Sequence, residues 1–360
     1  MPSLTGRPLL VLTIVLAILA VLGTVVLVYL ATRTRASTRA RRLAFVSGAL
    51  VLALLGPAFA VAATALMVNN SYGFYTSWAD LMGSGPGRTT ITANNLLKPG
   101  EGAVNVPAVD TSASAGGGRN EKLIVWLPPG YSPHAARPYP VVMFLPGQPS
   151  SPRSWFENFQ FARIASALVR THKMAPFVGV FPNLMIAPPR DTECTNIPGG
   201  AQAETWLNTG VPAYLTAHYH VAAPGQDWSV VGWSTGGFCA AKLATAHPGR
   251  FGSIAALGGY FTPLQDHRTG DLFGGVAQRF DHNSPLWLYQ HDHGLGGSRL
   301  LIVAGRQDSQ TWVESQRMLT ATQNDPAVSH LVFPTGGHNY RNYRAFLAQV
   351  LIWGAQSWRR

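Results

Sequence analysis

The segment Gly232-Trp-Ser234-Thr-Gly236 has the residue types and spacing of a serine nucleophile on a sharp turn. It follows the apolar run 228–233 and precedes a helical pattern at 236–248, which is the strand–turn–helix context that such a turn requires. Gly232 and Gly236 have no Cβ atoms, so the turn can be tight. We therefore predict that Ser234 is the nucleophile of an acyl-transfer reaction rather than an ordinary serine in a glycine-rich loop.

A serine hydroxyl is a poor nucleophile unless a histidine base and an orienting carboxylate accompany it. Two later loops supply these groups in the chain order Ser, Asp, His, which is typical of α/β-hydrolases. Asp308 follows the apolar run 300–305, and His338 follows the run 330–334. Because both residues come just after predicted strands, we expect Ser234, Asp308 and His338 to form a catalytic triad.

Each later member of this set also has an alternative interpretation. Asp308 could instead cap the helix that begins after it, and Asp325 and Glu314 are other carboxylates in the same region. His338 could be a solvated loop histidine. The agreement of three separate positions with one mechanism favours the catalytic interpretation.

The oxyanion of acyl transfer needs backbone N–H donors. Thr235, the residue after the nucleophile, is expected to supply one of them. The loop after the run 140–145 is expected to supply the second. We assign this donor to Gln148, because the neighbouring Gly147 allows a close approach to substrate. Pro146 has no N–H and can donate nothing.

Apolar runs alternate with helical patterns through the last two thirds of the chain. The runs that we interpret as strands are 122–127, 140–145, 177–182, 228–233, 253–257, 300–305 and 330–334. The helical patterns lie at 156–170, 203–219, 236–248 and 342–358. This alternation predicts a doubly wound, mostly parallel sheet. Together with the chain order Ser, Asp, His, it indicates an α/β-hydrolase domain over residues 120–360.

Two long uncharged segments precede this domain. Residues 9–31 and 43–68 are each long enough to cross a hydrocarbon core of about 30 Å. A signal peptide is the alternative for the first, but its apolar run is longer than that class usually has. We predict a membrane anchor over residues 1–68 with two transmembrane helices. A linker rich in glycine, proline and serine follows over residues 69–119.

Basic residues are concentrated between the two apolar segments, at Arg33, Arg35, Arg39, Arg41 and Arg42. A short arginine-rich loop stays on the cytoplasmic side of the plasma membrane, so the catalytic domain is expected on the extracytoplasmic face. This loop also supplies part of the formal net charge of +11, and we therefore expect no nucleic-acid partner. The expected partners are the membrane and an ester substrate.

The chain has only two cysteines, Cys194 and Cys239, both in the part predicted to be exported. A disulfide is the natural use of such a pair in an oxidising compartment, and two buried free thiols are the alternative. The sequence Asp281-His282, with His291-Asp292-His293, is a loop without the scaffold of a metal site, so we expect no metal.

The sequences VWLPPGYSPHAARPYPVVMFLPG, GWSTGG and FPTGGHNYRNYRAFL resemble the esterase D-like family of α/β-hydrolases, which includes the actinobacterial mycolyltransferases. The resemblance covers roughly residues 120–358. It implies acyl-ester chemistry through an acyl-serine, with Ser234, Asp308 and His338 at the matching positions. Many members carry His or Asp before the glycine of the oxyanion loop, where this chain has Pro146.

The resulting hypothesis is a membrane-tethered serine esterase that cleaves carboxylic esters of lipids or envelope components without a cofactor. An envelope acyltransferase of mycolyltransferase type would use the same residues, because water and a second alcohol can both resolve an acyl-enzyme. A hydrolase-like domain that only binds its partner is the alternative of another class.

Overall fold

The computed structural model describes residues 7–34, 39–72, 78, 96–110, 120–291 and 294–359. The chain divides into two compact units, Met1–Thr89 and Thr90–Arg360.

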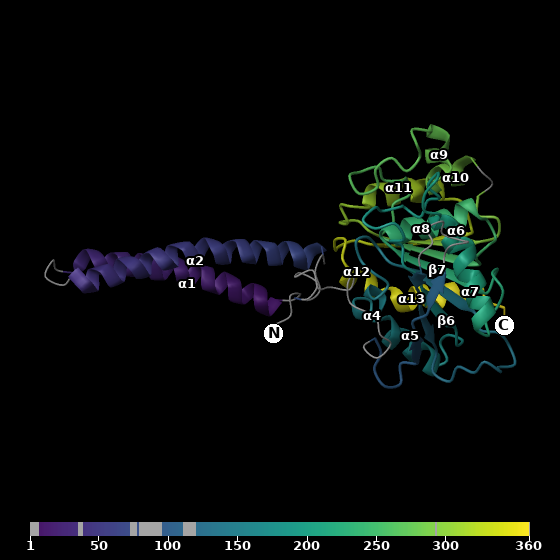
Figure 1. Ribbon diagram of the computed structural model, residues 1–360, viewed down its shortest axis with the longest axis horizontal. Coiled ribbons are helices and arrows are strands. Elements are labelled where there is room, and N and C mark those ends of the chain that lie inside the picture. The colour runs from purple at the N-terminus through teal and green to yellow at the C-terminus, as the bar shows by residue number, and fades with distance from the viewer. Residues whose placement is uncertain are drawn as a thin grey trace. The chain divides into compact units, whose positions relative to one another are not determined.

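The first unit contains two long helices, α1 (Arg7–Arg33) and α2 (Arg39–Tyr72), which lie side by side (Figure 1). Small residues let them approach closely: a Cβ added to Gly23 would lie 2.7 Å from Leu52 Cδ1, and Ala20 and Ala49 are buried. Most of the large apolar side chains on both helices are exposed. By length and composition, both helices are candidate membrane spans.

The second unit is built on an eight-stranded sheet (Figure 1). Its order is β1 (Ala103–Asn105), β4 (Ile124–Leu127), β6 (Val178–Phe181), β5 (Val141–Leu145), β7 (Trp228–Trp233), β8 (Ser253–Leu257), β9 (Arg299–Gly305) and β10 (Val328–Phe333). Strands β6 to β10 are parallel, whereas β4 is antiparallel to both β1 and β6. This confirms the predicted α/β class with a mostly parallel sheet.

Helices cover both faces of this sheet (Figure 1). One face packs against α7 (Val211–His218), α8 (Thr235–Ala246) and α11 (Trp312–Ala321). The other packs against α5 (Phe161–Arg170) and α13 (Leu347–Ala355). Side chains of the strands alternate between the two cores, which is why runs such as Val141–Leu145 are apolar throughout.

The remaining elements are short. They are β2 (Ala108–Asp110), β3 (Asn120–Lys122), α4 (Ser154–Glu157), α6 (Ala203–Thr205), the π-helical turn η3 (Trp206–Gly210), α9 (Ala277–Asp281), α10 (Pro285–His291) and α12 (Tyr340–Arg344). The sequence predicted a linker over residues 69–119, but part of that range is structured: β1, within residues 96–110, pairs with β4 as an edge strand of the sheet. That strand has only three residues and one buried side chain, Val104, so it carries no hydrophobic pattern in the sequence.

The register brings several loops to one edge of the sheet. Leu145 lies beside Gly232, Trp233 lies beside Leu257, and Phe333 lies beside Gly305. The carboxyl ends of β5, β7, β8, β9 and β10 therefore align. Ligand sites of open parallel sheets form along this edge.

Candidate active site

Ser234 lies on the turn between β7 and α8, with φ 56° and ψ −119°. The positive φ is a left-handed backbone conformation, which residues other than glycine rarely adopt. The flanking glycines are sterically required: a Cβ on Gly232 would lie 1.8 Å from Gly236 O, and a Cβ on Gly236 would lie 2.1 Å from Leu145 O. The sharp turn expected from the sequence is present, and it is packed directly against the end of β5.

The structure brings Ser234, His338 and Asp308 together from three separate loops. The distance between His338 Nε2 and Ser234 Oγ is 2.9 Å, and the distance between His338 Nδ1 and Asp308 Oδ2 is 2.7 Å. His338 and Asp308 are both buried. The series joins a hydroxyl, an imidazole and a carboxylate in the order that nucleophilic catalysis requires.

Asp308 is held in its ionised form by hydrogen bonds. Burial by itself would raise the pKa of this carboxyl, but the hydrogen bond from His338 and that from the Tyr343 hydroxyl lower its pKa on balance. An ionised Asp308 can only accept, so Nδ1 of His338 carries the proton. His338 Nε2 is then the acceptor, and the Ser234 hydroxyl donates to it.

The alternative roles considered for Asp308 are compatible with this arrangement. Its second oxygen, Oδ1, accepts from the backbone N–H groups of Gln310 and Thr311, so the same side chain also organises the turn before α11. The other carboxylates have different partners: Asp325 accepts from the Tyr289 hydroxyl, and Glu314 pairs with Arg317.

Two aromatic residues that the sequence analysis did not assign complete this arrangement. The rings of Trp233 and His338 stack, with centroids 4.3 Å apart and an interplanar angle of 20°. The hydroxyl of Tyr343 donates to Asp308 Oδ2 over 2.6 Å. Trp233 immediately precedes Ser234, and Tyr343 lies five residues after His338 on α12. Proximity to the motifs was the only signal in the sequence.

The predicted oxyanion donors lie on segments that meet at the nucleophile. Thr235 is the first residue of α8. A Cβ on Gly147 would lie 2.9 Å from Ser234 Cβ, so the loop that carries Gln148 packs against the serine. Among the backbone hydrogen bonds of the described residues, the N–H groups of Gln148 and Thr235 have no acceptor. Both amides are free to bind a ligand oxygen.

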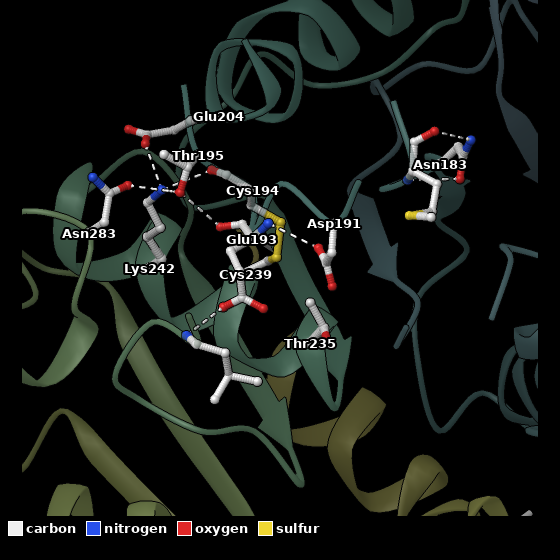
Figure 2. The surroundings of a disulfide bond; sticks show 12 residues. Asn183, Asp191, Glu193, Cys194, Thr195, Glu204, Thr235, Cys239, Lys242 and Asn283 are labelled. Atoms are coloured by element: carbon white, nitrogen blue, oxygen red, sulfur yellow. Dashed lines mark hydrogen bonds and ion pairs between the residues drawn. A yellow bond between two sulfur atoms is a disulfide. The ribbon is translucent and has the colours of Figure 1, made fainter. Parts of the chain in front are cut away.

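The two cysteines form a disulfide that joins the loop after β6 to helix α8 (Figure 2). The predicted pairing of Cys194 with Cys239 is therefore confirmed. Cys239 lies five residues after Ser234, so the bond fixes this loop to the helix that begins at the nucleophile.

A buried lysine reinforces the same connection (Figure 2). Lys242 Nζ donates to the carbonyl oxygen of Cys194 over 2.8 Å and pairs with Glu204 over 2.9 Å. Burial lowers the pKa of Lys242, and Glu204 opposes that shift. Burial would raise the pKa of Glu204, but the contacts with His247 and Lys242 lower it to about 2. Glu204 and Lys242 therefore form an ion pair beneath the loop.

No group of side chains suited to a metal ion occurs among the described residues. The rings of His282 and His291 instead both pack near Trp287, with ring centroids 5.2 and 4.5 Å from it. Asp292 and His293, the other candidates named from the sequence, lie outside the described residues.

Comparisons with known proteins also indicate an esterase. The family described as "Putative esterase" matches residues 114–354, which is more than half of the chain. An uncharacterised protein of Corynebacterium glutamicum is 26% identical over 268 residues, which are 70% of this chain and 61% of that protein. The MPT51 antigen of Mycobacterium leprae is 34% identical over 80 residues, which are 22% of this chain and 26% of the antigen. The chain thus spans less than two thirds of either relative.

Solved structures show the same fold. An S-formylglutathione hydrolase from Agrobacterium tumefaciens superposes with a TM-score of 0.61 at 18% identity, covering 74% of this chain and 99% of that chain. A ferulic acid esterase superposes with a TM-score of 0.60 at 18% identity, covering 71% and 97%. At this identity the likeness concerns the fold, and the family match carries the classification. The chain therefore belongs to this esterase family of α/β-hydrolases.

Proposed function

We propose that the chain is a serine carboxylesterase that cleaves esters of lipids or other envelope components through an acyl-serine intermediate. The observation that carries this proposal is the hydrogen-bonded series Ser234–His338–Asp308 on a strained turn. Ester hydrolysis through this series needs no cofactor.

The geometry supports a two-step reaction. His338 Nε2 takes the proton of Ser234 as Oγ attacks the ester carbonyl, and Asp308 stabilises the imidazolium that forms. The imidazolium then protonates the leaving alcohol, which departs and leaves the acyl-serine. Water attacks the acyl group, again with His338 as base. The imidazolium then returns the proton to Ser234 Oγ as the bond to the acyl group breaks, which releases the acid and restores the serine.

The oxyanion of each tetrahedral intermediate is assigned to the backbone N–H groups of Thr235 and Gln148. Thr235 is the first residue of α8, a helix of 12 residues whose N-terminus adds positive potential at this point. Pro146, which precedes Gly147, contributes no N–H, so the assignment uses the amide after the glycine.

Helices α1 and α2 are proposed to anchor the enzyme as two membrane spans. Their apolar side chains face outward from the helix pair, and Ala20, Ala31, Ala49 and Ala63 are buried. Such small residues permit close packing of helices in a bilayer, where outward apolar side chains are solvated by lipid. The positively charged ends, with Arg33 on α1 and Arg39, Arg41 and Arg42 on α2, support a cytoplasmic position for the connection between the helices.

The decisive experiment uses the detergent-solubilised full chain as wild type, Ser234→Ala and His338→Ala. A fluorophosphonate probe should label the wild type and leave Ser234→Ala unlabelled. Hydrolysis of p-nitrophenyl butyrate and palmitate should fall about 10³-fold or more in both variants. A folded wild type that neither labels nor hydrolyses either ester would overturn the enzyme assignment in favour of a binding domain.

Product analysis separates hydrolysis from transfer. The same acyl-enzyme can react with a sugar hydroxyl, as in an envelope acyltransferase of mycolyltransferase type. Mass spectrometry of a reaction that contains an acyl donor and a sugar acceptor would detect an acylated sugar. Release of free acid alone supports the esterase.

Protease treatment of intact spheroplasts tests the topology. The catalytic unit should be digested from outside, and the two apolar helices should remain in the membrane fraction. Protection of the catalytic unit would contradict its extracytoplasmic position. Removal of residues 1–31 from the mature protein would contradict the two-span anchor.

A further inference from the structure

Glu193 is a fully buried carboxyl that the proposed reaction does not use. It lies on the disulfide-linked loop, next to Cys194 (Figure 2). Its Oε1 is hydrogen-bonded to the Tyr260 hydroxyl, and its Oε2 accepts from the backbone N–H of Leu264 over 3.3 Å. The Tyr260 hydroxyl also lies 3.3 Å from Thr235 Oγ1. A continuous series of hydrogen bonds therefore joins Glu193 to the residue that follows the nucleophile.

The loop holds Glu193 in this position by several independent constraints. Its backbone is left-handed, with φ 47°, and its N–H donates to Asp191 Oδ1 over 3.0 Å. The disulfide fixes the next residue to α8, and Lys242 binds the carbonyl oxygen of Cys194. Such an over-determined, strained backbone is typical of functional positions.

The directions of the two hydrogen bonds of the Tyr260 hydroxyl depend on whether Glu193 is protonated. The Tyr260 hydroxyl has a single hydrogen, yet it lies between two oxygens, Glu193 Oε1 and Thr235 Oγ1. When Glu193 is protonated on Oε1, it donates to Tyr260, and Tyr260 donates to Thr235. When Glu193 is ionised, Tyr260 must donate to Glu193 and Thr235 must donate to Tyr260. Oε2 accepts from Leu264 in both states.

We propose that Glu193 is a positioning residue of the active site, which acts on Thr235 through Tyr260, and that its protonated form supports turnover. The proposal rests on the proposed esterase function. In the ionised form, a buried negative charge lies close to the oxyanion donor Thr235 and opposes the negative charge of the transition state. The protonated form keeps this region neutral.

Burial and a neighbouring carboxyl favour the protonated form of Glu193 at neutral pH. Burial raises the pKa of Glu193 most, and the nearby carboxyl of Asp191 raises it further. The hydrogen bonds from Tyr260 and Leu264 and the charge of Lys242 act in the opposite direction, and the resulting pKa is about 8. Asp191 itself is flanked by Asp266 and Arg268. Loss of the proton therefore falls within an accessible range of pH.

The test compares wild type with Glu193→Gln in the full chain, with kcat measured per active site titrated by fluorophosphonate. Glutamine can donate to Tyr260 and accept from Leu264, but it cannot ionise. Between pH 7 and pH 9.5, kcat of the wild type should fall at least threefold, whereas kcat of Glu193→Gln should stay level. The matched control Glu101→Gln removes a carboxyl near β1, four strands away from β7, and should keep the wild-type profile.

A second variant keeps the proposal testable if Glu193→Gln does not fold. Tyr260→Phe removes only the hydroxyl and should lower kcat per active site about tenfold, with KM within twofold. A merely structural role would lower the melting temperature and leave kcat per active site and its pH profile unchanged, which would overturn the inference. A wild type without any turnover would overturn the proposed function instead.

Discussion

Tyr343 and His338 donate to the same oxygen of Asp308. The Tyr343 hydroxyl lies 2.6 Å from Asp308 Oδ2, and His338 Nδ1 lies 2.7 Å from it. Burial and the charge of Asp308 raise the pKa of Tyr343, so its hydroxyl remains a donor. The shared oxygen is thus fixed by two directional contacts, which orients the carboxylate toward the imidazole.

We expect Tyr343→Phe to lower kcat/KM about tenfold, because the carboxylate loses one of the hydrogen bonds that orient it and lower its pKa. Asp308→Asn should lower it by about 10⁴-fold, since an amide that donates to Nδ1 selects the wrong tautomer of His338. Hydrolysis of p-nitrophenyl butyrate by folded variants measures both effects. Wild-type kcat/KM in Tyr343→Phe would show that the shared contact has no catalytic consequence.

Gly147→Ala should reduce kcat/KM by about 10²-fold, because the added methyl group would lie 2.9 Å from Ser234 Cβ and displace the oxyanion loop. Gly354→Ala is a matched control on helix α13, where the nearest atom to an added Cβ, Ser253 Oγ, lies 3.3 Å away. Its activity should remain within about twofold of wild type. Equal losses in the two variants would mean that general destabilisation, rather than the oxyanion loop, explains the effect.

The sequence was informative wherever a residue has a strong local signature. The strands that carry the site are apolar runs buried on both faces, and Ser234 is marked by its two glycines. Asp308 was found because it follows such a run, and His338 because it follows the apolar run 330–334, which forms most of the half-buried edge strand β10. Chain order and periodicity therefore predicted both the sheet and the three residues that the structure brings together.

Residues whose roles depend on tertiary contacts left no comparable signal. Tyr343 and Trp233 acquire theirs from packing against Asp308 and His338. Glu193 lies beside a cysteine, but its connection to Tyr260 spans 67 residues of sequence. The edge strand Ala103–Asn105 is defined by pairing with β4, which local propensity does not encode.

Replacement of both Cys194 and Cys239 by serine should reduce the free energy of unfolding by about 4 kcal/mol. The sequence separation is 45 residues, and the unfolded chain loses the entropic restriction of a loop of that size. Chemical denaturation of the detergent-solubilised protein measures the change, and reduction of the wild type should reproduce it. A loss below about 1 kcal/mol would indicate that Lys242 and the surrounding contacts hold the loop without the disulfide.

Lys242→Met should destabilise the protein by about 3–5 kcal/mol, because Glu204 and the carbonyl oxygen of Cys194 lose a buried partner. The pKa of Glu204 is lowered to about 2, so its contribution to stability is present above its ordinary value of 4.5 and is lost as pH falls toward 2. Addition of Glu204→Gln to Lys242→Met should recover part of the loss. If the double variant is as unstable as the sum of both single variants, the two residues are not coupled.

The free energy of unfolding should reveal the proton on Glu193 independently of catalysis. Its pKa is raised from 4.5 to about 8. Between these two pH values the native state therefore keeps a proton that the unfolded chain has already released. Stability is therefore fully present below pH 4.5 and decreases as pH rises through about 8. This residue contributes a slope of at most about 1.4 kcal/mol per pH unit. The stability difference between wild type and Glu193→Gln, followed by denaturation from pH 5 to pH 9, isolates this contribution. A constant difference would show that Glu193 is ionised throughout this range, and the direction of its hydrogen bond with Tyr260 would then be the reverse of the one proposed for the active enzyme.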